Sequence, residues 1–418
     1  MNQLLKATDN DIDIGYLKIR AYSSTNNIPI DNARIEIAGS GNPDEPIIVT
    51  ETNNDGITEN IELNAPPVEY SLEPSDNQPY SLYNIKISAP DYDETIISGV
   101  QILSGEKGIQ NIILSPSATS DETYSPTVIG GHTLWEYYPP KIAESEIKPI
   151  NESGEIVLSR VVIPEYVIVH DGAPTDTTAN NYYVLYRDYI KNVASSEIYA
   201  TWPESTIYAN VLAIMSFTLN RVYTEWYRNK GYDFTITSST AFDHKWIYQK
   251  TIYENISMVV DSIFANYLSR PGVKQPILTQ YCDGKRVTCP NWLSQWGSKY
   301  LGDQGYSAIE ILRNYYGSDI YINETTQISG VPSSWPGYDL TVGSTGNKVR
   351  QLQEQLNRIA RVYSSIPTLV VDGIYGQNTK NAVEQFQKIF DLPATGVTDY
   401  RTWYKISQIY VGVSGIGA

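Results

Sequence analysis

The sequence predicts a multidomain α+β protein: an N-terminal small β-sandwich, a central mixed α/β domain with long buried helices, and a C-terminal three-helix domain. Three observations predict this class. The 418 residues are too many for one ordinary core. Short β-rich segments fill residues 12–115, and neither Gly nor Pro interrupts residues 204–230. Apolar residues at helical spacing return between residues 349 and 390.

The N-terminal part, residues 1–115, reads as an all-β domain. The β-rich segments are residues 15–22, 33–39, 46–52, 58–64, 83–89 and 108–115. Turn signals such as TNNDG and SAPDYD separate them, as in a small sandwich. The stretch IPIDNARIEI resembles transthyretin-like and collagen-adhesin B-type modules. No catalytic constellation stands out, so we expect a structural, binding or inhibitory role.

Residues 116–160 have the composition of a connector. SPSATSDETYSPT is polar and rich in Pro, Ser and Thr, which is typical of an extended linker. The stretch PPKIAESEIKPINESGE continues it. Because exposed and weakly packed backbone is where proteases cut, we expect a protease-sensitive region here.

The central domain, residues 161–330, is expected to contain one dominant helix. Apolar residues recur at spacings of three and four from residue 207 to 226. Pro203 suits the first turn of this helix, and Gly231 is a natural stop. Further helices are expected over residues 251–270 and 291–317, the latter as one helix or as two broken near residues 302–305.

The C-terminal domain, residues 338–410, shows helical periodicity twice. Apolar residues at 349, 352, 356 and 359 define one helix, and those at 383, 386 and 390 define another. The segments VGSTGNKVRQLQEQLN, VDGIYGQNTKNAVEQFQ and LPATGVTDYRTWYKI together resemble the first peptidoglycan-binding domain family. The resemblance covers nearly the whole segment and implies peptidoglycan as a partner.

The charge and hydropathy exclude some function classes. A net charge of -17 disfavours a nucleic-acid binder and docking on an anionic membrane. No run of about 18 apolar residues exists, so we expect no membrane span. The start, MNQLLKATDNDIDIG, lacks a basic segment followed by an apolar one, so we expect no N-terminal signal peptide.

The stretch NVASSEIYATWPES holds one acid, Glu197, among small and aromatic residues. The block YRDYIKNVASSEIYATWPESTIYANVLAIMSFTL and the later block LSQWGSKYLGDQGYSAIEILRNYYG are similar to the stage II sporulation protein D family of lytic transglycosylases. The resemblance implies that Glu197 is the catalytic acid. The chain departs from the family at residues 208–210, where Lys-Ala-Gln is replaced by Tyr-Ala-Asn. It departs again at CPNW, which replaces Gly-His-Gly, so the role of that histidine does not transfer.

A lytic transglycosylase needs only one carboxyl group. The 6-hydroxyl of N-acetylmuramic acid attacks its own anomeric carbon, so the substrate supplies the nucleophile. One acid protonates the leaving oxygen and then accepts the hydroxyl proton, which gives a 1,6-anhydro product. No metal or cofactor is needed. For this role Glu197 should be protonated near neutral pH, and apolar walls such as Ile198, Tyr199 and Trp202 favour the neutral carboxyl.

Four further residues are candidates for substrate binding: Trp202, His244, Gln295 and Trp296. His244 can bind sugar, orient Glu197, ligate a metal or be a structural histidine. Gln295 and Trp296 can line a glycan groove, although Trp296 also fits a core position. Cys282 and Cys289 can close a disulfide loop or provide half of a zinc site, with His244 as a third ligand.

The domain order is similar to that of the clostridial spore cortex-lytic enzymes. This resemblance implies storage in the bacterial spore, in the cortex or coat region, as a zymogen. It also implies an activating protease and degradation of cortex peptidoglycan during germination. We place the activation zone around NESGEIVLSRVVIPEY. Two alternatives stay open: a hydrolytic muramidase with a second acid such as Asp171 or Asp243, and a non-catalytic wall-binding sporulation protein.

Overall fold

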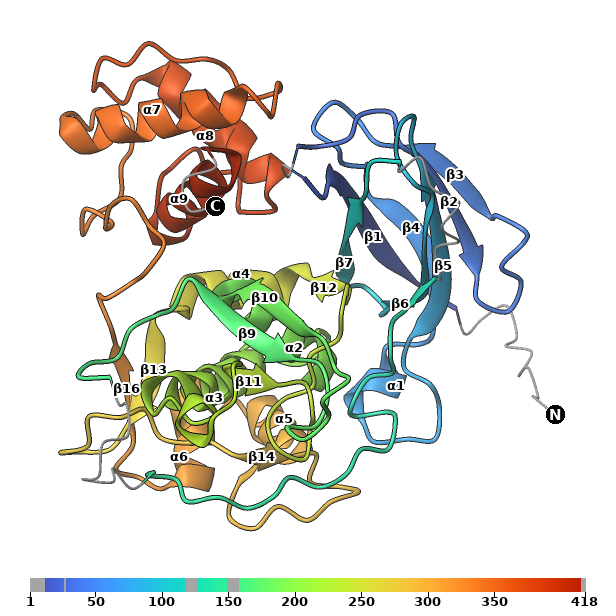
Figure 1. The fold of residues 1–418 in the computed structure, drawn as a ribbon, viewed down its shortest axis with the longest axis vertical. Helices are drawn as coiled ribbons and strands as arrows, with labels where there is room; N and C mark the ends of the chain where they lie inside the picture. Colours follow the sequence, from blue (N-terminus) through green and yellow to red (C-terminus); the bar gives the residue numbers. More distant parts are fainter. Residues whose placement is uncertain (1–11, 26–27, 118–125, 149–157, 415–418) are drawn as a thin grey trace.

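The computed structural model describes residues 12–25, 28–117, 126–148 and 158–414. It shows a mixed α/β chain with two sheets on the N-terminal side, a central body and a C-terminal group of helices (Figure 1). The described part of the connector runs along the surface of the central body (Figure 1). Part of the activation zone that we placed, residues 151–157, lies outside the described residues.

The N-terminal domain contains two sheets whose inward side chains share one core. The strand orders are β3-β2-β5-β6-β8 and β12-β7-β1-β4. Within β1, Leu17, Ile19 and Ala21 are buried in this core, so Lys18 and Arg20 point to the other face of their sheet. The elements are β1 (Asp13–Ser23), β2 (Arg34–Gly39), β3 (Ile48–Glu51), β4 (Ile61–Ala65), α1 (Glu69–Leu72), β5 (Ser81–Ser88), β6 (Thr95–Ile102), β7 (Lys107–Leu114) and β8 (Thr127–Val128).

One strand of the second sheet comes from the central domain. β12 (Ile252–Tyr253) pairs antiparallel with β7, with Ile252 opposite Ile109 and Tyr253 opposite Gly108. A Cβ atom on Gly108 would lie 2.8 Å from Thr251 Cγ2, so the close approach requires glycine. Main-chain pairing therefore joins the N-terminal and central domains.

The central domain is built around the long helix α3 (Glu204–Tyr223), whose residues are mostly buried. α3 contacts each of the other four helices of the domain. Its three sheets have the orders β10-β9-β11, β13-β16 and β14-β15. The other elements are β9 (Tyr166–His170), β10 (Asn181–Leu185), α2 (Tyr186–Glu197), a 3₁₀ turn (Arg228–Lys230), β11 (Ile236–Thr237), α4 (Glu254–Ile263), β13 (Asn266–Ser269), β14 (Tyr281–Cys282), β15 (Leu293–Ser294), α5 (Gln295–Asp303), α6 (Ala308–Tyr316) and β16 (Tyr321–Glu324).

Two expected helices are shorter than their patterns indicate. The helix expected to reach Gly231 ends at Tyr223, and Gly231 instead follows the 3₁₀ turn with a left-handed φ of 84°. The helix expected over residues 251–270 is only α4. The residues on either side of it pair as β12 and β13 with distant strands, which overrides the local helical pattern. Residues 291–317 contain the two helices α5 and α6, separated at Gly305.

The C-terminal domain contains α7 (Asn347–Ala360), α8 (Gln377–Ile389) and α9 (Tyr400–Ser414). The four apolar residues that predict α7 are all fully buried. The rings of Phe264 and Tyr404 lie 5.3 Å apart, so α9 packs against the end of α4, and one hydrophobic core continues from the central domain into this one. Among the described residues, no helix has the length and apolar character needed to cross a membrane.

Candidate active site

Glu197 is the last residue of α2, and its exposed fraction is 3%. Every residue of α2 except Asp188 is buried, so the helix is fixed along its length. The backbone N–H of Ile198 closes the helix on the carbonyl of Ala194 at 3.0 Å. The carboxyl group of Glu197 is therefore presented from a rigid support, as a catalytic group requires.

Three neutral donors hold the Glu197 carboxyl group. The backbone N–H of Lys245 donates to Oε1 at 2.8 Å. Gln295 Nε2 donates to Oε2 at 3.2 Å, and Thr133 Oγ1 donates to the same oxygen at 3.3 Å. Glu197 takes part in none of the ion pairs found in the described part of the chain. The groups that hold this carboxyl group by hydrogen bonds are therefore uncharged.

The carboxyl group lines a cavity of about 60 Å³. Tyr281 and Gln295 line it from the central domain, and residues 136–141 line it from the connector. Within the described residues, the Tyr281 hydroxyl has no hydrogen-bond partner of good geometry. Burial, and then the nearby Glu197, raise the pKa of Tyr281 well above its ordinary value, so it stays a neutral donor. The carboxyl group of Glu197 and the hydroxyl group of Tyr281 thus line the same small cavity.

Two other carboxylates line this cavity, and neither is a free second acid. Asp283 accepts hydrogen bonds from the backbone N–H groups of Lys285, Arg286 and Val287, at 3.0–3.2 Å, within its own loop. Glu136 belongs to the connector rather than to the central domain. The cavity therefore offers one acid from the central domain that is not tied into a turn.

The two acids named for a hydrolytic mechanism lie outside the cavity lining. Asp243 is fully buried, and its Oδ1 pairs with Arg221 Nε at 2.7 Å. Its Oδ2 accepts from Tyr227 Oη at 2.6 Å and from the Thr237 backbone and hydroxyl at 2.9 and 2.7 Å. Asp171 is exposed at the end of β9. Asp243 thus belongs to a structural ion pair, and neither Asp243 nor Asp171 lines the cavity of Glu197.

The structure brings Gln295 to Glu197 as a direct partner. Besides its bond to Oε2, Gln295 Nε2 donates to the backbone carbonyl of Glu197 at 2.9 Å. Gln295 is the first residue of α5, and the Ser294 hydroxyl caps that helix by accepting from the Gly297 N–H. The SQWG sequence therefore places an amide side chain against the acid at the start of a capped helix.

Trp202 and Trp296 form an aromatic cluster with Tyr199 beside this site. The ring centroids of Trp202 and Trp296 are 5.0 Å apart, and each lies about 6 Å from Tyr199. Both tryptophans are buried in this state. Trp202 Nε1 donates to the carbonyl of Ser71, in α1 of the N-terminal domain, at 2.9 Å. The N-terminal domain thus covers one part of the cluster.

His244 lies beneath the cavity and does not contact Glu197. It is fully buried, and Nδ1 lies 3.0 Å from the hydroxyl of Tyr189. Its ring packs between Phe217 and Tyr281, at 4.4 and 5.7 Å. Burial lowers the pKa of His244 well below its ordinary value, so the ring is neutral. Its substrate-binding role stays a prediction.

The two cysteines form a disulfide. Cys282 and Cys289 are bonded to each other, with their Cα atoms 5.6 Å apart. The bond closes the loop that carries Asp283 beside the cavity. No cluster of three or more potential metal ligands exists in the described part of the chain. Of the two readings left open for these cysteines, the structure selects the disulfide.

The connector closes the cavity. The backbone N–H and the hydroxyl of Thr133 both donate to the Ser196 carbonyl at 3.1 Å, next to the acid. Further along, the ammonium group of Lys141 lies 4.6 Å from the ring centre of Tyr281. Ligand pockets usually have volumes of about 300–1,000 Å³, so the remaining 60 Å³ cannot hold a disaccharide.

The following part of the connector is bound in the same way, rather than loosely as its composition suggests. The Ile142 N–H donates to the Ala241 carbonyl at 2.7 Å, and Glu144 pairs with Arg221 through both carboxylate oxygens. Glu146 pairs with Arg270 of the central domain. Residues 131–148 therefore form a strap with both polar and ionic contacts.

Three contributors to the site escape the sequence patterns. Thr133 is 64 residues from Glu197 in the chain, and Lys245 contributes only its backbone N–H. Tyr281 precedes Cys282 in TQYCDG, and no spacing marks it as a site residue. The sequence pointed to the segment around Lys245 only because the neighbouring His244 is a candidate for substrate binding.

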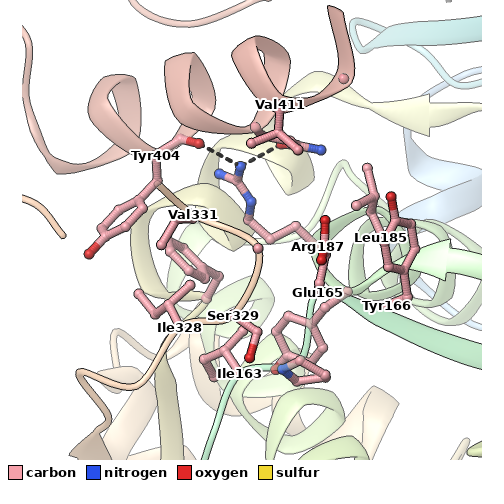
Figure 2. Close-up of a pocket in the computed structure, with 16 residues that line it drawn as sticks. Ile163, Glu165, Tyr166, Leu185, Arg187, Ile328, Ser329, Val331, Tyr404 and Val411 are labelled. Carbon is pink, nitrogen blue, oxygen red and sulfur yellow. Dashed lines mark hydrogen bonds between the residues drawn. The ribbon is translucent and has the colours of Figure 1, made fainter. Parts of the chain in front are cut away.

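A larger cavity, of about 250 Å³, lies between the central and C-terminal domains. Figure 2 shows Arg187 reaching from α2 towards α9. Glu165 and Tyr166 also line this cavity. It shares no lining residue with the Glu197 cavity. We assign the candidate active site to the smaller cavity because of its chemistry.

Comparison with family models bears on the C-terminal domain. Residues 345–406 match the family model described as a putative peptidoglycan binding domain. Over 76 residues the chain is 40% identical to the zinc D-Ala-D-Ala carboxypeptidase of Streptomyces albus G, a match that covers 18% of this chain and 28% of that protein.

Among solved structures, the minor pilin GBS52 of Streptococcus agalactiae is 13% identical, with a TM-score of 0.19, and covers 28% of this chain and 50% of its own. The 5-hydroxyisourate hydrolase of Klebsiella pneumoniae is 10% identical, with a TM-score of 0.17. The match covers 25% of this chain and 92% of the hydrolase chain. These two carry no argument about function. The C-terminal domain is similar to peptidoglycan-binding domains, which supports a protein associated with the cell wall.

Proposed function

We propose that the chain is a peptidoglycan lytic transglycosylase that is made as an inactive precursor and degrades spore cortex during germination. The observation that carries the proposal is Glu197, one buried carboxyl group held by neutral donors at a cavity. The similarity of residues 345–406 to peptidoglycan-binding domains supports the polymer as substrate. The spore setting rests on the sequence resemblance alone.

In this mechanism Glu197 acts twice. Its proton passes to the glycosidic oxygen between N-acetylmuramic acid and N-acetylglucosamine as the bond from that oxygen to the anomeric carbon breaks. The 6-hydroxyl oxygen of the same muramic residue bonds to the anomeric carbon, and its proton returns to the Glu197 carboxylate. The acid is regenerated and no water is consumed. Gln295 and the Lys245 N–H orient the carboxyl group throughout.

A glycan strand has a plausible path beside the acid. A second space, of about 280 Å³, is lined by Tyr199 and Trp296 and shares Asp283 and Arg286 with the Glu197 cavity. Aromatic faces of this kind suit sugar rings, which carry C–H bonds on their faces. In this state residues 70–79 of the N-terminal domain and Trp135 of the connector also line that space, so the path is covered.

The strap supports the precursor part of the proposal. Thr133 bonds to the catalytic carboxyl, and residues 136–141 occupy the opposite wall of the cavity. Removal of these residues would open the site to a polymer. Cleavage of the chain after Lys148, followed by loss of residues 1–148, should therefore raise turnover strongly over that of the intact chain.

The decisive experiment is product analysis with Glu197→Gln. The intact protein with a cleavage site inserted after Lys148 is cut and incubated with cortex fragments, and the products are identified by mass spectrometry. The wild type should release fragments with anhydro-muramic ends, and Glu197→Gln should release none. Glu204→Gln, an exposed acid at the start of α3, is the matched control and should keep full activity. Reducing ends would instead indicate hydrolysis, and an active Glu197→Gln would remove the proposed acid.

A further inference from the structure

Two cations on the outer face of β1 contact the C-terminal domain. Lys18 Nζ lies 2.7 Å from Asp391 Oδ1, and Arg20 pairs with the other oxygen of the same carboxylate. The three side chains are only 4–15% exposed. Polar residues on the outer face of a sheet normally face water, so their burial marks a contact surface.

Lys18 and Arg20 also contact backbone carbonyl groups at the C-terminal end of α8. Arg20 Nη2 donates to the carbonyl of Ile389 at 2.8 Å, and Lys18 Nζ lies 3.4 Å from the carbonyl of Lys388. These are the last two residues of α8, where carbonyl groups lack a helical partner and the helix dipole favours positive charge. Burial alone would raise the pKa of Asp391, but Arg20 and Lys18 hold it below its ordinary value.

Further contacts belong to this surface. Asp55, in the loop before β4, accepts from the backbone N–H of Ser365 at 3.4 Å. The Arg20 guanidinium also lies 5.7 Å from the ring centre of Phe390. Figure 1 shows the C-terminal helices beside the N-terminal sheets and above the central body. The N-terminal domain thus reaches the C-terminal domain directly.

The C-terminal domain has a second, independent anchor on the central domain. Arg187 donates to the carbonyl of Tyr404 in α9 at 3.0 Å and also contacts Gln408 (Figure 2). A cavity of about 430 Å³ remains where the three domains meet, lined by Tyr22 and Asp188 among others. The contacts of the N-terminal domain with Asp391 are polar and border this cavity, which is typical of interfaces that separate.

We propose that the surface around Asp391 is a docking site for the N-terminal domain of the same chain, and that this contact restrains the C-terminal domain in the precursor. Loss of the N-terminal domain would remove both cations from Asp391 and leave only the contacts of α9 with the central domain, such as those of Arg187 and Phe264. The N-terminal region then controls wall binding as well as access to Glu197. The inference rests on the proposed precursor, but its test does not require catalysis.

The test uses the intact chain with Glu197→Gln, so that the wall is not degraded during the assay. Asp391→Asn is added to this background. The control is Glu384→Gln, a half-buried acid on the same helix that pairs with Lys388 at 2.9 Å. Amide hydrogen exchange is followed in residues 386–392 and 16–22, and binding to insoluble peptidoglycan is followed by sedimentation.

With Asp391→Asn, both segments should exchange at least about tenfold faster than in the control, because a buried ion pair has lost its anion. The apparent Kd for peptidoglycan should fall about threefold or more as the restrained state is depopulated. The double change Lys18→Gln and Arg20→Gln, which leaves the C-terminal domain unaltered, should reproduce both effects. Exchange equal to the control in both variants would overturn the docking contact, and faster exchange with unchanged wall binding would overturn the restraint.

Discussion

Glu197 and Asp243 are two buried acids of the same domain with opposite surroundings. Both side chains are at most 3% exposed. They belong to the same part of the fold, because Glu197 accepts a hydrogen bond from the backbone N–H of Lys245, two residues after Asp243. Asp243 is paired with the Arg221 guanidinium and accepts three further hydrogen bonds. Glu197 has only neutral donors and lines a cavity. The chemistry of the partners, rather than burial, separates these two acids.

The difference has a thermodynamic meaning. The buried Arg221 guanidinium is compensated by Asp243 and Glu144, so removal of the Asp243 charge would leave a buried cation with less compensation. Glu197 belongs to no ion pair among the described residues, and its charged neighbours Lys141 and Lys245 act on it without a direct salt bridge. Asp243 therefore stabilises the fold, and Glu197 is the acid that is presented to the cavity. Substitution of Glu197 or Asp243, one at a time, tests this difference.

The largest expected effect is the loss of activity in Glu197→Gln. The amide keeps the size of the side chain but removes the proton, so turnover of the cut protein should fall about 10³-fold. No ion pair is broken, but the amide nitrogen would replace an oxygen that accepts hydrogen bonds, so the free energy of unfolding should fall by about 1–2 kcal/mol. Product release from cortex fragments and urea unfolding measure the two quantities. A loss of stability that accounts for the loss of activity would contradict the assignment.

Asp243→Asn should show the reverse pattern. Arg221 would keep only Glu144 as an anionic partner, and Tyr227 and Thr237 would face an amide instead of a carboxylate. We expect a loss of about 3 kcal/mol in the free energy of unfolding, measured in urea. Asp303→Asn, which breaks the exposed pair with Lys299, should cost less than about 1 kcal/mol. Equal losses in the two variants would remove the structural role of Asp243.

The sequence predicts Glu197 as a site residue more readily than it predicts the groups that surround Glu197. The SSE and SQWG motifs point to Glu197 and Gln295, and the structure places these two in contact. Thr133 and the Lys245 N–H reach Glu197 only through tertiary folding, so no local pattern marks them.

The same limit applies to the fold. Helical periodicity defines α7 and the start of α3, whereas the bounds of α4 depend on strands paired at both its ends. The alternation in β1 marks Lys18 as outward-facing, but nothing local shows that another domain covers it. Long-range pairing and domain contacts are what a local pattern omits.

Lys250 extends the comparison to a buried amine that has no anionic partner among the residues that the structure describes. It is 3% exposed and donates to the Gln101 amide in β6. Burial, and then Lys245, lower the pKa of Lys250 to about 7 from 10.5. Between these two pH values the unfolded chain binds more protons, so stability rises with pH, and below pH 7 the full penalty is present.

Lys250→Met should therefore be more stable than the wild type at pH 7, and this advantage should shrink by about 2 kcal/mol at pH 9. Lys148 and Lys405, whose pKa values burial lowers to about 8 and about 7, titrate in both proteins and cancel in the difference. Urea unfolding at the two pH values measures it. A pH-independent difference would show that Lys250 is charged in the folded protein.

The smallest effect tests the neutral donor that the strap supplies to Glu197. Thr133→Val removes the hydroxyl that bonds to Glu197 and to the Ser196 carbonyl, while the backbone bond to Ser196 stays. One neutral hydrogen bond contributes about 1 kcal/mol, so the strap should open about fivefold more often and the basal turnover of the uncut chain should rise by the same factor. Ser145→Ala removes an exposed hydroxyl from the same strap, away from the cavity, and should leave basal turnover unchanged. If the two variants behave alike, the Thr133 hydroxyl does not hold the strap over the acid, and the closed site must depend on the ionic contacts further along it.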